Sequence, residues 1–332
     1  MNERRLIVLV AAILAAHVEV QVQAQVQVQV QAQVQAFPTK PIKLVVPFPP
    51  GGATDTTARL ISQQLQTRLG QSVIIENQGG AGGSIGAKQV ANATPDGHTL
   101  LMSSASTFGT HPVLYRLDYD PLKAFAPVAT AVVDKLVLVA GPALAVNNVH
   151  ELVAYAKAHP GELNYGNAIG IGPHFTAEMF KIKSGANIQH IPYRGGAPMI
   201  ADLVAGQIHM TINGKSVLLP HIQGGKVRAL GVTAAERWAD MPDVPTLLEL
   251  GYLDDPYDVS FGIVAPAGTP VAAIARLNGV INEALRSPET RAALERLGIE
   301  PKITTPQEFA ALIAVEAPRW AKAVRQTGIK VE

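Results

Sequence analysis

The stretch 45–55 contains the residues of this chain that are best suited to binding an anion. Gly51 and Gly52 carry no side chain, so the backbone can approach a ligand closely there. The N–H groups from Gly52 to Thr54 are predicted to lie at the start of a helix, where unpaired donors and the helix dipole favour an anion. The alternative is a tight strand-to-helix connection with Thr54 or Asp55 as the helix N-cap.

A second chemical pattern occurs at residues 82–86, which read Gly-Gly-Ser-Ile-Gly and match the Gly-x-Ser-x-Gly elbow of serine hydrolases. That motif needs a strand running directly into the serine, whereas the predicted strand here ends near Asn77 and a glycine run follows. The chain has no cysteine, and its histidines lack metal-ligand spacing. We therefore expect a protein that is not an enzyme and uses no metal or cofactor, with a serine hydrolase as the minor alternative.

Length and composition indicate a globular protein of about two domains. Apolar residues make up 48% of the 332 residues, which is enough for sizeable cores. The formal net charge is +1, and Lys and Arg are scattered along the chain. No basic face suggests binding to nucleic acid.

The N-terminus has the pattern of a secretory signal peptide. Two arginines within the first five residues precede an apolar run at 6–16 that is too short to span a bilayer. A low-complexity Val/Gln/Ala alternation follows to Ala36. We expect cleavage after Ala36, with Ala24 and Ala32 as alternatives, and therefore a periplasmic mature protein that starts near Phe37.

Beyond this segment, β-rich apolar runs alternate with helical patterns, which predicts parallel α/β sheets. The strands are expected at 42–46, 72–75, 99–103, 128–133, 136–140, 164–166, 188–192, 209–213, 229–233 and 259–265. The helices are expected to open near 53 and 172 and to cover 84–93, 148–158, 197–205, 216–223, 270–286, 288–297 and 305–326.

Ligands of open parallel sheets bind beyond the carboxyl ends of the strands. The loops rich in glycine or in small hydroxyl residues lie at such ends, at 49–55, 78–84, 103–107, 166–174 and 193–197. If these loops converge, they form a small-molecule site built largely from backbone N–H groups.

Several short sequence pieces, in this order, resemble one protein family over residues 37–332. They are Pro-x-Lys-Pro-Ile at 38–42, Val-Val-Pro-Phe-Pro-Pro-Gly-Gly-x-x-Asp at 45–55, Ala-Gly-Gly-x-Ile-Gly at 81–86, Pro-Asp-Gly-x-Thr-Leu at 95–100, His-Ile-Pro-Tyr-Arg-Gly at 190–195, Leu-Gly-Val-Thr at 230–233, Asp-Val-Pro-Thr at 243–246 and Ala-Pro-x-Gly-Thr-Pro at 265–270. The chain thus resembles the Bug-type periplasmic solute-binding receptors of tripartite tricarboxylate transporters.

This resemblance implies an α/β periplasmic-binding-protein fold of the Venus flytrap type. Domain 1 would contain 37–138 and 262–332, domain 2 would contain 139–261, two hinge strands would join them, and the C-terminal helices would return to domain 1. The family typically binds carboxylates, largely through backbone amides and bridging waters, and passes them to a membrane permease. We expect a small organic carboxylate or an amino acid as the ligand of this chain, with transient contact to permease subunits. We expect a monomer, and the alternative function is a periplasmic sensor.

From these loops and the resemblance, we predict ligand contacts from Phe48, Pro49, Gly51, Gly52, Ala53, Asp55, Ser104, Ser106, Asn167, Gly170, Gly172, His174, Tyr193, Arg194, Gly195 and Asn213. Asp55 either suits the helix dipole or holds a ligand amine. Arg194 either pairs with a distal carboxylate or lies solvated on the rim, and Lys215 has the same alternatives. His174 either donates to the ligand or makes a structural hydrogen bond. The loop at 172–174 is one residue shorter than is usual in the family.

Overall fold

The computed structural model describes Gln21 and residues 37–330. The predicted signal peptide and the Val/Gln/Ala alternation therefore lie outside the described residues, apart from Gln21. The chain divides into two compact units, Met1–Thr39 and Lys40–Glu332, and all the elements below belong to the second. Within the described part, none of the helices has the length and hydrophobicity needed to cross a membrane.

The first part of the unit alternates strands and helices as predicted. Its elements are β1 (Ile42–Val46), α2 (Ala53–Leu69), β2 (Val73–Asn77), a 3₁₀ turn (Ala81–Gly83), α3 (Ser84–Ala91), β3 (Thr99–Ser104) and α4 (Thr107–Leu114). Strand β1 pairs in parallel with both β2 and β3, so its buried residues lie in the middle of this sheet. Helix α4 was not predicted from the sequence.

The middle of the chain repeats this alternation. Its elements are α5 (Val149–Ala158), β5 (Asn164–Ala168), α6 (Gly172–Ser184), β6 (Gln189–Tyr193), α7 (Gly196–Val204), β7 (Met210–Gly214), α8 (Lys215–Gln223) and β8 (Arg228–Val232). Strand β5 pairs in parallel with β6 and β7. A buried cluster that includes Met199, Leu203 and Trp238 packs against this sheet.

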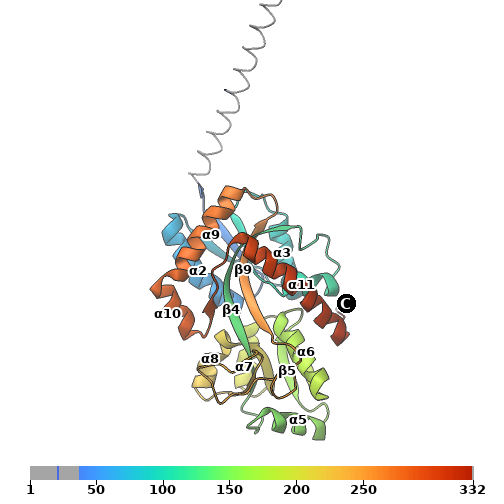
Figure 1. Cartoon of the computed structure of the whole chain (residues 1–332). Helices are drawn as coiled ribbons and strands as arrows, with labels where there is room; N and C mark the ends of the chain where they lie inside the picture. Colours follow the sequence, from blue (N-terminus) through green and yellow to red (C-terminus); the bar gives the residue numbers. More distant parts are fainter. Residues whose placement is uncertain (1–20, 22–36, 331–332) are drawn as a thin grey trace, which may run out of the picture. The chain divides into compact units, whose positions relative to one another are not determined.

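Two long strands connect the sheets, and they run antiparallel to their neighbours. Strand β4 (Phe125–Ala140) was predicted as two strands but is continuous, because Asp134 and Lys135 stay within the ladder. Its first part pairs with β9 (Asp258–Pro266) and its end pairs with β7 and β8. In Figure 1, β4 and β9 run from the half that contains α2 and α9 to the half that contains α5 and α6. The predicted parallel pairing holds for β1 with β2 and β3 and for β5 with β6 and β7, and the antiparallel β4 and β9 make the sheet mixed.

The C-terminal part is helical, as predicted, with α9 (Val271–Arg286), α10 (Pro288–Arg296) and α11 (Pro306–Thr327). Ser287 caps α10, and Thr305 forms a capping box with Glu308 at the start of α11. A short strand that was not predicted, β10 (Glu300–Pro301), pairs with β4. Strand β9 is therefore not the last strand of the chain.

Helices α4 and α11 pack closely because Gly109 has no side chain. A Cβ on Gly109 would overlap the backbone carbonyl of Ala317 in α11.

We predict that Gly109→Ala lowers the free energy of unfolding by about 1–3 kcal/mol, the usual cost of overpacking. The control is Gly279→Ala on the exposed side of α9, where a Cβ meets nothing within 4 Å. The control should gain up to about 1 kcal/mol from helix propensity. Urea denaturation measures both, and equal effects would contradict the packing argument.

Candidate ligand-binding site

Four helices begin at the edge of one cavity with a volume of about 60 Å³. They are α2, α6, α7 and α8, and their N-cap residues, Gly52, Ile171, Gly195 and Gly214, all line it. None of these four N-cap residues provides a side-chain hydrogen bond to its helix, because three are glycines and the fourth is isoleucine. The cavity is therefore bordered by backbone N–H donors and by the positive ends of helix dipoles, which together favour an anion.

Helices that begin elsewhere in the described chain show a useful contrast. Asn148, Ser287 and Thr305 cap α5, α10 and α11 with their side chains, and none of these three residues lines the cavity. Helices α3, α4 and α9 also lack a side-chain cap, so a missing cap does not by itself mark the site. The site is distinguished by the convergence of four helix starts on one cavity.

The rest of the cavity wall is mainly apolar. Its apolar part includes Phe48, Leu136, Ala168, Pro173, Met199, Val259 and Phe261. Thr54, Ser104 and Asn213 add neutral polar groups. Among the described residues that line the cavity there is no Lys or Arg, and Asp134 is the one ionisable side chain.

The predicted contact residues fall into three groups. Those that line the cavity are Phe48, Gly52, Ala53, Ser104, Gly172, Gly195 and Asn213. Pro49, Tyr193 and Arg194 instead line a neighbouring pocket of about 750 Å³, which shares Phe48 and Ala168 with the cavity. Gly51, Asp55, Ser106, Asn167, Gly170 and His174 line neither of these two spaces.

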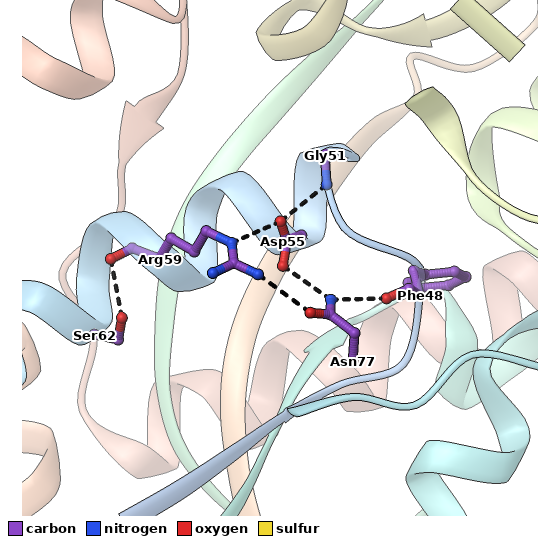
Figure 2. A network of polar contacts seen from close by, with 6 residues as sticks. All are labelled: Phe48, Gly51, Asp55, Arg59, Ser62 and Asn77. Carbon is purple, nitrogen blue, oxygen red and sulfur yellow. Dashed lines mark hydrogen bonds and ion pairs between the residues drawn. The ribbon is translucent and has the colours of Figure 1, made fainter. Parts of the chain in front are cut away.

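Asp55 holds the loop before α2 in place (Figure 2). Its Oδ2 accepts the Gly51 N–H and the Arg59 Nε–H, each at 2.9 Å. Asn77 Nδ2 donates to Asp55 Oδ1 and to the Phe48 carbonyl, also at 2.9 Å each. The carboxylate thus faces the loop it supports and is almost fully buried, with 2% exposure.

This network corrects the predicted helix cap. The N-cap of α2 is Gly52, not Thr54 or Asp55, because the Asp55 side chain reaches back to the N–H of Gly51, outside the helix. Burial by itself would raise the pKa of Asp55, but the hydrogen bonds from Arg59, Gly51 and Asn77 outweigh it and hold that pKa below its ordinary value of 3.8.

Loops from the two sheets approach each other at these helix starts. A Cβ on Gly52 would lie 3.6 Å from the backbone nitrogen of Gly196, and one on Gly51 would lie 3.3 Å from the Cβ of Ala197. A Cβ on Gly172 would lie 3.3 Å from Ser106 Oγ. Small residues at these positions therefore permit the helix starts to close around the cavity.

Asn167 and Ser106 lie behind residues of the cavity wall. Asn213 Nδ2 donates to Asn167 Oδ1 at 2.9 Å, and Asn167 Nδ2 donates to the Ile212 carbonyl at 3.1 Å. Ser106 Oγ and Ser104 Oγ are hydrogen-bonded at 2.6 Å. Asn167 and Ser106 are thus placed to orient Asn213 and Ser104, which do line the cavity.

His174 is a buried residue that lines neither of the two spaces, and its Nε2 has no hydrogen-bond partner among the described residues. It is 1% exposed, its ring stacks on His190 with 4.3 Å between centroids, and its Nδ1 accepts the Gly170 N–H at 3.5 Å. Burial lowers the pKa of His174 to about 3, so the ring is neutral at pH 7. The Gly170 carbonyl accepts from Thr110 Oγ1 at 2.7 Å, which ties this loop to α4.

Basic side chains lie away from the cavity. Arg194 is exposed and lines the larger pocket. Lys215 Nζ pairs with Asp240 at 2.5 Å and lies 4.8 Å from the ring centroid of Trp238. Gly214, and not Lys215, therefore lines the cavity at the start of α8.

Sequence reasoning missed Asp134, which lies inside β4. It is 1% exposed, and its carboxylate accepts the Ser216 N–H at 3.0 Å and the Ser216 Oγ–H at 2.5 Å. Asp134 in β4 thus caps the first turn of helix α8. Burial raises the pKa of Asp134 to about 6 against the opposing effect of these hydrogen bonds. An acidic residue inside a buried strand was the signal available in the sequence.

Further lining residues that were not predicted include Thr54, Ile171, Gly196 and Met199.

Comparison with known proteins gives consistent matches over most of the chain. The family model described as "Tripartite tricarboxylate transporter family receptor" matches residues 57–329. Protein BugT of Bordetella pertussis is 40% identical over 300 residues, which cover 89% of this chain and 92% of BugT.

Three solved structures have a similar fold. An R. palustris protein with adipate is 35% identical with a TM-score of 0.85, covering 89% of this chain and 100% of that one. The periplasmic binding protein BugD is 34% identical with a TM-score of 0.84 and the same coverage. MatC from Rhodopseudomonas palustris with bound malate is 34% identical with a TM-score of 0.81, covering 87% and 100%. The predicted two-domain periplasmic-binding-protein fold is confirmed, and the domain boundaries stay a prediction.

We predict that Asp55→Ala lowers the free energy of unfolding at pH 7 by about 1.5–3 kcal/mol, because it removes charge-assisted hydrogen bonds to a buried carboxylate. The folded-state pKa of Asp55 is lowered, so its contribution is present above the ordinary value of 3.8 and is lost as the pH falls through the folded-state pKa. Urea denaturation of wild type and variant between pH 7 and pH 3 should show this difference shrinking in acid.

The control for this prediction is Asp254→Ala, which removes an exposed ion pair with Lys183. Exposed pairs contribute little, so this variant should stay within about 0.5 kcal/mol of the wild type. Equal effects of the two substitutions would contradict a structural role for Asp55.

Proposed function

The chain belongs to the tripartite tricarboxylate transporter receptor family, and we propose that it is an exported receptor that captures a small carboxylate in the cavity at the helix starts. In this proposal, the receptor delivers its ligand to the family's membrane permease in a transient contact. The observation that carries it is the convergence of α2, α6, α7 and α8 on a cavity whose described lining has no Lys or Arg.

Backbone donors recognise a carboxylate at such a site by geometry. N–H groups at helix starts point along the helix axis into the cavity, and an anion there also gains from the helix dipole. Apolar residues form much of the cavity wall, and hydrogen bonds to an anion are stronger in such surroundings than in water. Trapped water can bridge the remaining distances.

The cavity favours a compact ligand. A cavity needs a volume of roughly 10–15 Å³ to hold one water molecule. The volume here is about 60 Å³, which suits a ligand of a few heavy atoms. The related structures with adipate and with malate support a small carboxylate as the ligand class here. A longer ligand would have to extend past Phe48 and Ala168 into the larger pocket.

Export to the periplasm agrees with two observations. Residues 1–16 have the pattern of a signal peptide, and the related BugD is a periplasmic binding protein. We therefore infer that the mature receptor is periplasmic.

A binding role suits this site better than hydrolysis. Strand β2 ends at Asn77, and a 3₁₀ turn separates it from Ser84, so Ser84 does not sit on the strand-to-helix elbow that a nucleophile needs. Ser84 is also absent from the lining of the cavity.

We predict that Gly52→Val abolishes carboxylate binding while the protein stays folded. The backbone at Gly52 has a φ of −84°, which valine can adopt, and a Cβ there would lie 3.6 Å from the nitrogen of Gly196. The γ-methyl groups would then fill the gap between α2 and α7. Isothermal titration calorimetry with succinate, malate and adipate measures the loss, and circular dichroism checks the fold.

Arg194→Ala is the comparison variant for this prediction. Because Arg194 is exposed in the outer pocket, its removal should cost less than about 10-fold in affinity, whereas a lost charge-assisted hydrogen bond usually costs roughly 10- to 150-fold. Normal binding by Gly52→Val together with a loss above about 100-fold in Arg194→Ala would replace backbone recognition with an arginine clamp.

A further inference from the structure

The cavity lining contains a buried carboxyl group whose hydrogen-bond partners in the described chain are neutral. Asp134 lines the cavity and accepts two hydrogen bonds, both from Ser216. Lys135, the next residue in β4, pairs with Glu300 at 2.6 Å, and Lys215, the residue before Ser216, pairs with Asp240 at 2.5 Å. Neither lysine is paired with the Asp134 carboxylate, although the charge of Lys215 favours its ionised form and the charge of Asp258 opposes it.

Such a carboxylate is costly to bury in its charged form, and burial accordingly raises its pKa to about 6. An ionised carboxylate has about four acceptor positions. Ser216 occupies two of them, so acceptor capacity remains on a side chain that lines the cavity. A cationic donor within the cavity would satisfy both the charge and the remaining acceptors.

The cavity lining combines a carboxyl group, that of Asp134, with backbone N–H donors at helix starts. Asp134 already satisfies the start of α8, because it accepts the Ser216 N–H in that helix. The starts of α2, α6 and α7 remain as donors for an anion. A ligand that fits both must carry a carboxylate for the helix starts and a cationic N–H donor for Asp134, whereas a second carboxylate near Asp134 would be repelled.

We propose that Asp134 is a specificity-determining residue that makes the cavity select amino carboxylates over carboxylates without an amine. This inference rests on the proposed function of the cavity as a carboxylate site. Asp258 on β9 is the matched control, because it also carries a partly buried carboxyl group and pairs with the residue after Asp134 in the ladder. Unlike Asp134, Asp258 does not line the cavity.

The test is isothermal titration calorimetry at pH 7.5 with pairs of compounds that differ in one ammonium group. The pairs are L-alanine with propionate, L-aspartate with succinate, and L-glutamate with glutarate. For the pair that binds best, the wild type should bind the aminated member about 10- to 150-fold more tightly, the usual effect of one charge-assisted hydrogen bond. Asp134→Asn should bring this ratio close to one, and Asp258→Asn should leave it unchanged.

Each remaining outcome has a clear meaning. Binding of succinate, glutarate or propionate with no preference for the amine overturns the role of Asp134 and leaves the proposed function intact, and so does an unchanged ratio in Asp134→Asn. Failure of all six compounds, and of malate and adipate, to bind overturns the proposed function and this inference with it. If circular dichroism shows that Asp134→Asn does not fold, a wild-type ratio close to one still overturns the proposed role of Asp134.

Discussion

The structure depends on a single physical constraint, which is that backbone donors at helix starts must not be left unpaired inside the protein. At the cavity, the N-cap residues of α2, α6 and α7 supply no side-chain partner. A ligand or water must therefore satisfy these donors when the cavity is closed. Small residues around the cavity let the helix starts come close together. The buried hydrogen bonds of Asp55 hold the loop before α2 in position.

Two carboxylates near the helix starts have different roles because they face different ways. Asp55 turns back to the Gly51 N–H and is fully engaged with Arg59 and Asn77, so it shapes the loop and adds no charge to the cavity lining. Asp134 reaches across from β4 to α8 and lines the cavity. The first supports the loop before α2, and the second places a carboxyl group in the cavity lining at the start of α8.

Much of this arrangement could be predicted from the sequence, because Pro and Gly mark the loops and the apolar periods mark the elements. The predicted strand 42–46 coincides with β1, and the helices predicted to begin at 288 and 305 match the starts of α10 and, to within one residue, of α11. Strand direction was not predictable, since β4 and β9 pair antiparallel over long range and no local pattern encodes that. The same holds for Asp134, whose capping of α8 joins residues far apart in the chain.

The central claim is that backbone N–H groups at converging helix starts hold the ligand carboxylate. A high-resolution crystal structure with the tightest-binding carboxylate tests it most directly. The account predicts carboxylate oxygens within about 2.7–3.2 Å of main-chain nitrogens at the starts of at least two of α2, α6 and α7. A carboxylate held instead by the Arg194 guanidinium in the outer pocket would contradict it.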